Sequence, residues 1–246
     1  MKIALIGYGK MGQTIEKVTQ KTNHEIVAKI DPKSKQATAA KISAENLNNA
    51  EIAIDFTHPT IVVENLRKLS DLKISAVVGT TGWYEHLSEV EKIATNAGTG
   101  ILYAGNFSLG VNIFYAIVSE AAKRLAKINK MDVAIHEIHH TGKADAPSGT
   151  ARELSMKILK NFPSKKRVLL DNTEQPVPKD ALQISATRLG KVVGIHTVAF
   201  DGFSDSIELI HRGKNRDGYA MGAIMGAEWL AGKTGIFSVE DWLHKT

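Results

Sequence analysis

The segment KIALIGYGKMG, residues 2–12, is the clearest indication of how the first part of this chain folds. A short apolar run leads into a loop with glycines at positions 7, 9 and 12, and a helical stretch follows to about Lys21. In such a loop the first glycine permits a tight turn, the second lets the backbone approach a pyrophosphate, and the third allows close helix–strand packing. The loop predicts a dinucleotide site at Gly7, Tyr8, Gly9, Lys10, Met11 and Gly12. The alternative is a glycine-rich turn kept only for packing.

Asp31 lies about twenty residues beyond this loop, at the end of a second apolar run, Glu25 to Ile30. A carboxylate there binds ribose hydroxyls and favours NAD, because the 2'-phosphate of NADP would meet a like charge. In the alternative interpretation, Asp31 only caps a turn. Lys10, Lys33 and Lys35 could each meet a phosphate, although plain solvation is favoured for the last two. We therefore expect NADH or NADPH as cofactor, with a preference for NADH.

Apolar runs and helix-like segments continue to alternate up to about residue 107. The runs are Ile52 to Phe56, Ile74 to Val78 and Ile101 to Tyr103, and the helix-like segments are Thr60 to Ser70 and Tyr84 to Ala97. Strands that are apolar on both faces and joined by helices favour a parallel sheet covered on both sides. The pattern predicts a Rossmann-like, doubly wound α/β fold.

Two polar loops follow strands of this predicted sheet. Ligands bind beyond the carboxyl ends of the strands in open parallel sheets, so both loops are candidates for cofactor binding. Ordinary turns, which Gly, Asn and Ser also form, are the alternative. The candidate residues are Gly79, Thr80, Thr81, Ala104, Gly105, Asn106 and Phe107.

The pattern changes after about Phe107. We expect a helix over Val111 to Ile128, a strand ending at Ile138, a helix from about Ala151, and a return to helix from Tyr219. Between the last two helices lie three alternating strands: Gln183 to Leu189, Ile195 to Phe200 and Ser206 to His211. A turn at Asp201-Gly202 should pair the last two antiparallel. The sequence predicts a dinucleotide-binding domain of residues 1–107 plus 216–246, and a second, α+β domain built on a mixed sheet, residues 108–215.

Composition restricts the class of protein. With 246 residues, 43% hydrophobic content and no cysteine, the chain is typical of a globular protein without disulfides or a thiol nucleophile. The net charge of +5 is mild and the basic residues are interleaved with acids, which disfavours nucleic-acid binding. The absence of a membrane-spanning run and of a cleavable leader predicts a cytoplasmic protein with no membrane partner.

The segment EIHHTGKADAPSGTA, residues 137–151, carries the strongest chemical signal. Histidines and a lysine stand beside a predicted helix start, where Thr150 and Glu153 form a capping-box pattern. Histidine titrates near neutrality, and the unpaired N–H groups of a helix start suit a carboxylate. The segment therefore predicts binding of a small anion that exchanges a proton. Asp145 either orients Lys143 or caps the loop.

The two histidines and the glutamate of this segment, together with His136 just before it, also raise the question of a metal. His136, Glu137, His139 and His140 lack the i, i+4 spacing of helical zinc sites, so we expect no metal. On a regular strand His139 and His140 point to opposite faces, so only one reaches a ligand unless the strand has already ended. His136 is expected to pack or to form a hydrogen bond.

Nearly the whole chain resembles the dihydrodipicolinate reductase family, most specifically in residues 137–151 and in the loops at 7–12, 79–82 and 106–108. The resemblance implies that His139 is the proton donor or acceptor and Lys143 a second proton donor. It also implies substrate binding by His140, Gly149 and Thr150, with the cofactor held by the loop residues named above. Pro32 stands where many members have an arginine, which affects cofactor selectivity.

The implied activity is NAD(P)H-dependent reduction of the small dicarboxylate 4-hydroxy-tetrahydrodipicolinate to tetrahydrodipicolinate, in diaminopimelate and lysine biosynthesis. The resemblance also implies a homotetramer joined through the sheet of the second domain. Two alternatives remain: another Rossmann-type oxidoreductase acting on a small carboxylic acid, and a non-catalytic dinucleotide sensor. A sensor that regulates genes should show a helix-turn-helix or a clustered basic face, and neither is visible.

Overall fold

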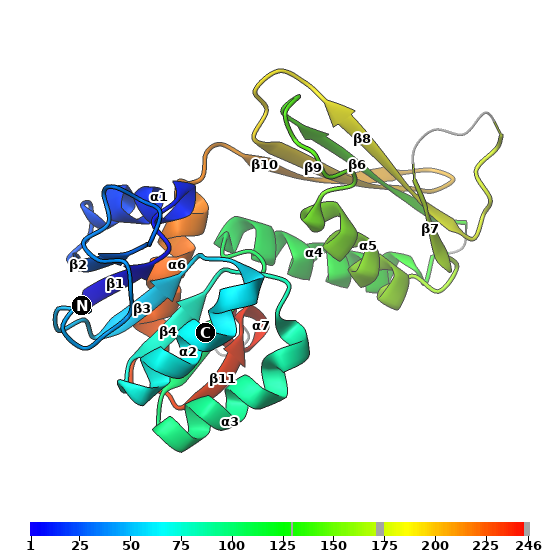
Figure 1. Ribbon diagram of the computed structural model, residues 1–246. Coiled ribbons are helices and arrows are strands. Elements are labelled where there is room, and N and C mark those ends of the chain that lie inside the picture. The colour runs from blue at the N-terminus through cyan, green and yellow to red at the C-terminus, as the bar shows by residue number, and fades with distance from the viewer. Residues whose placement is uncertain (129, 171–174, 244–246) are drawn as a thin grey trace. The chain divides into compact units, whose positions relative to one another are not determined.

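The chain divides into two compact units in a computed structural model that describes residues 1–128, 130–170 and 175–243. The first unit is Met1–Leu109 with Arg216–Thr246, and the second is Gly110–Asn215. Figure 1 labels the elements of both. No helix in the described residues is both long enough and apolar enough to cross a membrane.

The first unit is built on a six-stranded sheet of order β11-β5-β4-β3-β1-β2, in which every pairing is parallel. Its strands are β1 (Lys2–Ile6), β2 (Glu25–Ile30), β3 (Ile52–Asp55), β4 (Ser75–Val78), β5 (Gly100–Tyr103) and β11 (Gly235–Ser238). This confirms the predicted parallel, Rossmann-like sheet. Strand β11 was not predicted: its four residues are short, and it adds to the edge of the sheet from the far end of the chain.

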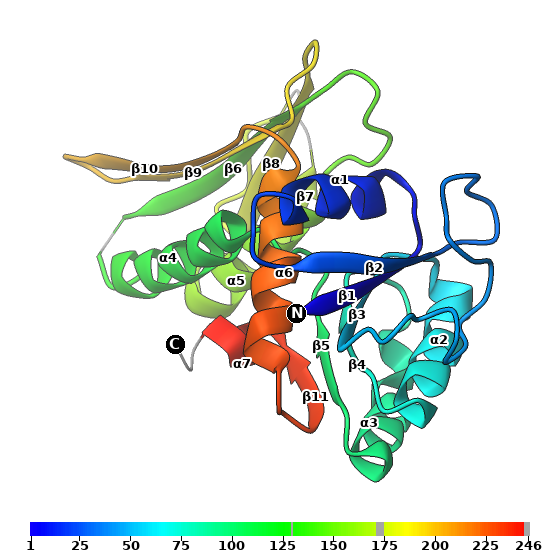
Figure 2. The same ribbon diagram turned by 90° about the vertical axis from the view of Figure 1, so that its left-hand side faces the viewer.

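Helices cover both faces of this sheet, as Figure 2 shows. Helices α1 (Lys10–Thr19) and α6 (Asp217–Leu230) pack on one face, and α2 (Pro59–Asp71) and α3 (Leu87–Ala97) pack on the other. Alternate residues of β1 explain the two cores, because Ile3 and Leu5 face α1 and α6 while Ala4 and Ile6 face α2 and α3. A 3-10 turn (Tyr84–His86) precedes α3, and α7 (Val239–Leu243) follows β11.

The small residues of α6 allow it to lie close to the end of β5. A Cβ atom at Gly222 would lie 1.7 Å from the backbone oxygen of Phe107, and one at Gly226 would lie 2.8 Å from Leu102 Cδ2. Close approach of this helix, which its composition predicts, thus brings it against the loop that contains Phe107.

The second unit is built on a mixed five-stranded sheet of order β10-β9-β6-β8-β7. Its strands are β6 (Asp132–His139), β7 (Arg167–Leu170), β8 (Ala181–Arg188), β9 (Gly194–Asp201) and β10 (Ser206–Gly213). Strands β9 and β10 are antiparallel around the turn at Asp201-Gly202, as expected, whereas β8 runs parallel to both β6 and β7. The short edge strand β7 was not predicted.

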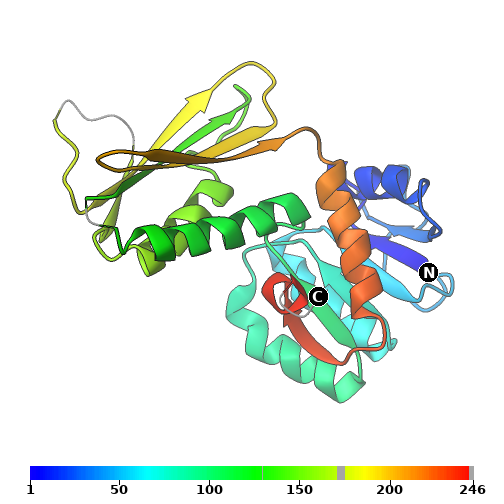
Figure 3. The ribbon, with the colours of Figure 1, turned by 180° about the vertical axis from the view of Figure 1, so that it is seen from behind.

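Only one face of this sheet is covered by helices of its own unit among the described residues. Helices α4 (Leu109–Leu125) and α5 (Gly149–Asn161) pack there, around a core that includes Phe114, Leu154 and Phe200 (Figure 3). The strand register and the alternation of side chains give the opposite face, called the open face below. The open face includes Ala134, His136, Ile138, Gln183, Ser185, Thr187, Ile195, Thr197, Ala199, Glu208, Ile210 and Arg212.

Candidate active site

The glycine loop of the first unit has the geometry that its sequence predicts. Gly7 adopts a φ of +88°, and a Cβ there would lie 2.4 Å from the backbone oxygen of Phe56. A Cβ at Gly12 would lie 2.5 Å from the Gly7 backbone oxygen, whereas at Gly9, the N-cap of α1, nothing lies within 4 Å. Gly9 therefore leaves the start of the helix open to a phosphate, while Gly7 and Gly12 allow the close packing around it.

Asp31 follows β2 and is bonded to this loop. Its Oδ2 atom accepts a hydrogen bond of 2.8 Å from the Tyr8 backbone N–H, and its Oδ1 atom accepts from the N–H groups of Lys33 and Ser34. The carboxylate thus caps the turn after β2, which was one of the two interpretations. Because each carboxylate oxygen has two lone pairs, this capping leaves Asp31 able to accept from ribose hydroxyls as well.

A buried carboxylate that sequence reasoning missed organises the loops after β3 and β4. Asp55 is fully buried and accepts hydrogen bonds from the hydroxyl of Thr57 at 2.7 Å, the amide of Asn65 at 2.9 Å and the hydroxyl of Thr80 at 3.0 Å. Burial raises its pKa, and the hydrogen bonds from Thr57, Asn65 and Thr80 oppose that rise. Asp55 therefore fixes Thr80, one of the predicted cofactor residues, from beneath the loop.

The two predicted loops after β4 and β5 lie side by side. A Cβ at Gly105 would lie 3.5 Å both from Thr81 Cγ2 and from the hydroxyl of Tyr84. Phe107 is buried and meets Phe56 edge to face, and Asn106 accepts a hydrogen bond of 2.8 Å from the Ser108 N–H. Most of the predicted cofactor residues thus belong to the carboxyl ends of strands of one sheet or to the loops that follow, and Lys10, Met11 and Gly12 form the first turn of α1.

In the second unit, the alternation of side chains along β6 separates His136 from His139. Glu137 and His139 point to the same side and are buried, whereas His136 points to the open face and bonds Ser185 Oγ at 2.7 Å. The strand ends at His139, so His140 lies outside its regular alternation. His136 therefore forms the hydrogen bond expected of it, away from the acid–base group.

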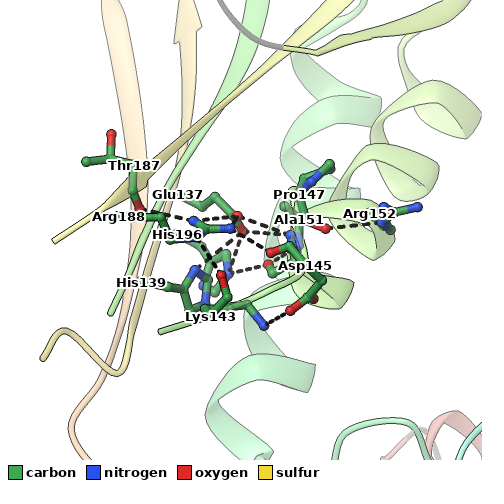
Figure 4. Close-up of polar contacts among 11 residues, drawn as sticks. Glu137, His139, Lys143, Asp145, Pro147, Ala151, Arg152, Thr187, Arg188 and His196 are labelled. Carbon is green, nitrogen blue, oxygen red and sulfur yellow. Dashed lines mark hydrogen bonds and ion pairs between the residues drawn. The ribbon is translucent and has the colours of Figure 1, made fainter. Parts of the chain in front are cut away.

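Glu137 lies at the centre of the polar cluster drawn in Figure 4. Its two carboxylate oxygens each lie 3.1 Å from the Ser148 backbone N–H, and Arg188 approaches Oε1 at 3.4 Å. Nδ1 of His139 and Nε2 of His196 each lie 3.6 Å from Oε2. Burial raises the pKa of Glu137, but hydrogen bonds from His196 and Ser148 and the nearby His139 outweigh it and lower the pKa to about 2. The side chain is therefore a buried anion at neutral pH.

His139 is a neutral imidazole in the free protein. Burial lowers its pKa to about 4, with Glu137 opposing the shift and His196, Lys143 and Arg188 adding to it. Its ring packs edge to face on His196 with 5.0 Å between centroids, and its Nδ1 has no hydrogen-bond partner in the described part of the chain. A Cβ at Gly194 would lie 3.0 Å from its Nε2 atom, so the glycine leaves space beside that nitrogen.

The loop after β6 holds Lys143 in an ion pair. Lys143 Nζ lies 2.6 Å from Asp145 Oδ1, and this hydrogen bond lowers the pKa of the Asp145 carboxyl. Arg188 fastens the same loop, because it donates to the backbone oxygen of Asp145 at 2.6 Å and to that of Lys143 at 3.4 Å. Of the two interpretations of Asp145, the structure supports the one in which it orients Lys143.

The helix after this loop begins two residues earlier than predicted. Ser148, not Thr150, is the N-cap of α5, and its hydroxyl accepts from the Ala151 N–H at 3.2 Å. The capping-box interpretation of Thr150 and Glu153 is therefore wrong. The N–H groups of Gly149 and Thr150 have no acceptor within the residues that the structure describes, so both remain available to an anion.

Sequence reasoning missed four members of this cluster: Ser148, Arg188, His196, and Glu137, which was weighed only as a metal ligand. Glu137 could have been found, since it is two residues from His139 on a strand and so shares its face. Arg188 and His196 come from β8 and β9, and only the strand pairing brings them to β6. No local pattern around either residue marks this role.

The geometry also brings together one group of potential metal ligands. Single ligand atoms of Glu137, His139 and His196 lie within 4.8 Å of one another, whereas the grouping considered from the sequence also contained His136 and His140. Both Glu137 oxygens already accept from the Ser148 N–H, and the charges of Lys143 and Arg188 lie nearby. The local electrostatics therefore favour an anionic ligand over a cation.

A parallel sheet with a glycine-rich phosphate loop, joined in one chain to an acid–base cluster in an α+β unit, defines a Rossmann-type oxidoreductase. Residues 1–107 match the family described as dihydrodipicolinate reductase, N-terminus, and residues 110–243 match dihydrodipicolinate reductase, C-terminus. The chain belongs to the dihydrodipicolinate reductase family.

Individual relatives agree with this assignment. A 4-hydroxy-tetrahydrodipicolinate reductase from Christiangramia forsetii is 39% identical over 245 residues, which cover 99% of this chain and 98% of that protein. The structure of a dipicolinate-bound dihydrodipicolinate reductase from Paenisporosarcina sp. TG-14 is similar with a TM-score of 0.81 at 24% identity, covering 99% of both chains. An engineered D-amino acid dehydrogenase bound to NADP+ shares the fold, with a TM-score of 0.58 at 12% identity over 97% of this chain and 93% of its own.

Proposed function

We propose that this chain reduces 4-hydroxy-tetrahydrodipicolinate to tetrahydrodipicolinate with NADH or NADPH, a step of diaminopimelate and lysine biosynthesis. The single observation that carries this proposal is the cluster in the second unit. It combines a buried imidazole, a lysine ammonium and free N–H groups at the start of α5, which is the set that a proton-accepting dicarboxylate requires. Family membership and the relatives' names support the same substrate.

The pyridine nucleotide would be held by residues of the first unit. The fit rests on Gly7 and Gly12, which have no room for a side chain, and on Gly9, which leaves the start of α1 open. When bound, the reduced nicotinamide supplies the hydride. Gly79, Thr80, Thr81 and the Ala104 to Phe107 loop would complete this site, with Asp55 positioning Thr80 from below.

We expect NADH to be preferred. The Asp31 carboxylate faces the loop where the ribose would lie, and it disfavours a 2'-phosphate. Lys33 and Lys35 are exposed and form no defined fork, so they offer a second phosphate only point charges.

The substrate would be bound through its two carboxylates. The N–H groups of Gly149 and Thr150 would hold one of them, and His140 and Lys143 would contact the substrate beside it. The positive charges of Lys143 and Arg188, which help to keep His139 neutral in the free protein, are those that a dicarboxylate would offset. Substrate binding should therefore raise the pKa of His139, so that the imidazole can accept and donate a proton. Lys143 would be the second proton donor.

The open face of the second unit supports a homotetramer. It presents Ile138, Ile195, Thr197 and Ile210 without a covering helix from the described residues of this unit. We propose that copies of the chain join through this face and that the second unit serves both substrate binding and assembly. The cytoplasm is the expected location.

A coupled assay tests the activity directly. A synthase generates the substrate, and loss of reduced-cofactor absorbance is followed with NADH and with NADPH. We expect turnover with both cofactors and a higher kcat/KM with NADH; a large preference for NADPH would contradict the role given to Asp31. An absence of turnover with both would reject the proposed function.

His139→Ala and Lys143→Ala test the proton donors. Each should lower kcat by about 10²-fold or more, because a positioned acid contributes at least that much. Binding of NADH, measured by fluorescence titration, should persist, since both residues lie in the second unit and the glycine loop lies in the first. Wild-type turnover in both variants would remove their proposed roles.

A further inference from the structure

The buried carboxylate of Glu137 has no role in the reaction described so far, although it contacts every part of the proton-transfer site. It is completely inaccessible to solvent and lies two residues before the end of β6. A buried charge is costly unless it is paired and hydrogen-bonded, so such a group needs an explanation. The groups that surround its two carboxylate oxygens provide that explanation.

One set of contacts joins Glu137 to the anion-binding start of α5. The Ser148 N–H lies 3.1 Å from both carboxylate oxygens, and the Ser148 hydroxyl both caps the helix and lies 3.1 Å from His196 Nε2. The carboxylate thereby fixes Ser148, which directly precedes the free N–H groups of Gly149 and Thr150.

A second set joins Glu137 to the loop of Lys143. Arg188 approaches Oε1 with both terminal nitrogens at 3.4 Å and donates to the backbone oxygens of Lys143 and Asp145. Figure 4 shows Arg188, His196 and His139 converging on the carboxylate from separate strands. Glu137 thus contacts the start of α5 directly and the Lys143 loop through Arg188.

The third contact is with His139 itself. Its Nδ1 is buried, lies 3.6 Å from Glu137 Oε2, and has no hydrogen-bond partner among the described residues. A movement of a few tenths of an ångström would turn this contact into a hydrogen bond. The other nitrogen, Nε2, lies beside Gly194, where no side chain fills the space. The ring is therefore oriented with one nitrogen toward an anion and the other toward Gly194, which has no side chain.

We propose that Glu137 is the positioning residue of this site: its carboxylate receives the Nδ1–H of His139, which leaves Nε2 to exchange the proton with the substrate. This assignment deepens the proposed reductase function and, in its catalytic part, rests on it. In the step, the imidazolium Nε2–H bond breaks and the proton passes to the substrate. His139 returns to the neutral form with its Nδ1–H in place, and Glu137 stays ionised throughout.

The charged groups around His139 determine the direction of the effect. Glu137 on the same strand favours the protonated ring, whereas His196 on β9, Arg188 on β8 and Lys143 in the loop disfavour it. His211 lies beyond His196, with 6.5 Å between their ring centroids. The charge of Glu137 raises the pKa of His139, so its neutralisation should lower that pKa.

The first test uses the wild-type protein without substrate. Histidines are labelled with ¹⁵N, the His139 signal is assigned by its absence in His139→Gln, and the tautomer is read from the two ring nitrogen shifts. We expect the neutral ring to carry its proton on Nδ1. A neutral ring protonated on Nε2 would overturn the proposal. Because no turnover is involved, this result stands even if the proposed reaction is wrong.

The second test compares Glu137→Gln with Asp132→Asn. Asp132 lies on the same strand and pairs with the buried Lys165 at 2.5 Å, so its loss also removes an ion pair of a buried group but leaves His139 untouched. In Glu137→Gln we expect kcat to fall by about 10²-fold, the low end for a positioned acid. In the plot of kcat against pH, the limb on which kcat falls as the pH rises should move to lower pH. The KM for the cofactor should not change. Asp132→Asn should keep the wild-type kcat and limb.

Each outcome decides the question. A lower kcat in Glu137→Gln with an unmoved limb would show a merely structural role and overturn the proposal, as would wild-type kinetics. If Glu137→Gln does not fold, Glu137→Asp keeps the charge at a longer distance and should show a smaller loss with the Nδ1–H tautomer retained. An Nε2–H tautomer in that variant with undiminished kcat would count against the role.

Discussion

Two buried groups of the second unit make its stability depend on pH. The pKa of His139 is lowered to about 4 from its ordinary 6.5, and that of Glu137 is lowered to about 2 from 4.5. Between pH 6.5 and 4 the unfolded chain binds a proton at His139 that the folded chain does not, so stability is lost as the pH falls. Glu137 acts in the same direction in a lower window, from about pH 4.5 to 2. Both groups therefore make the fold most stable near neutrality.

Acidification from pH 7 to pH 5 should reveal the histidine. We expect the free energy of unfolding to fall by on the order of 1–2 kcal/mol because of His139. His139→Gln should lose less stability over the same interval than the wild type, measured by urea titration at each pH. His86→Gln, an exposed histidine of the first unit, serves as control and should behave as the wild type. An unchanged pH dependence in His139→Gln would contradict the buried neutral imidazole.

At the scale of single residues, the sequence predicts those functional groups that cluster as an unusual set of side chains within one short segment. His139 and Lys143 stand out because they share a segment with a helix start. Arg188 and His196 do not, since a lone arginine or histidine on an alternating strand is ordinary. Their role depends on β8 and β9 pairing with β6, and the register of that pairing is a tertiary property.

At the scale of elements, the start of α5 shows how a local rule selects the wrong residue. Thr150 and Glu153 fit the capping-box spacing, but Ser148 occupies the N-cap position and bonds the Ala151 N–H. The preceding chain is fixed by contact of Ser148 with Glu137 and His196, so the helix begins where these buried contacts place it. Tertiary contacts thus decide between two residues that are both good caps.

Substitution of the two candidate caps separates them. Ser148→Ala should destabilise the protein by about 1 kcal/mol, the usual cost of losing an N-cap. Thr150→Ala should change stability by less than about 0.5 kcal/mol, since Thr150 lies inside the first turn. Urea unfolding monitored by circular dichroism measures both. A larger loss in Thr150→Ala than in Ser148→Ala would restore the capping-box interpretation.

The elements missed from the sequence are short strands at the edges of the sheets. Strand β7 (Arg167–Leu170) and strand β11 (Gly235–Ser238) have four residues each and none of these is fully buried, whereas the equally short β3, β4 and β5 are buried apolar runs. Each forms because a neighbouring strand offers an unpaired edge: β8 for β7 and β5 for β11. The longer strands and the helices were predicted to within a few residues, because their periodic apolar positions face a core.

At the scale of the whole molecule, the open face makes a specific prediction about assembly. Ile210→Glu places a charge on that face, where Ile210 is 44% exposed in the single chain. If copies join there, the buried charge should dissociate the tetramer while circular dichroism stays unchanged. Sedimentation velocity measures the change. Met156→Glu is the matched control, because Met156 is 57% exposed on α5, which packs on the other face of the sheet. A tetramer that survives Ile210→Glu but not Met156→Glu would place the contact elsewhere.

The fold class, the glycine loop and the segment that carries the proposed proton donors can all be recognised from the sequence. These are local or periodic properties: turn chemistry at three glycines, alternation of apolar residues, and an unusual set of side chains within fifteen positions. What surrounds them depends on the fold of the whole chain. Asp55 beneath the cofactor loops and the convergence of Arg188, His196 and Ser148 on Glu137 arise from strands and loops far apart in the chain. The charge state of a buried imidazole depends on that surrounding, because burial and neighbouring charges act through space and not along the sequence.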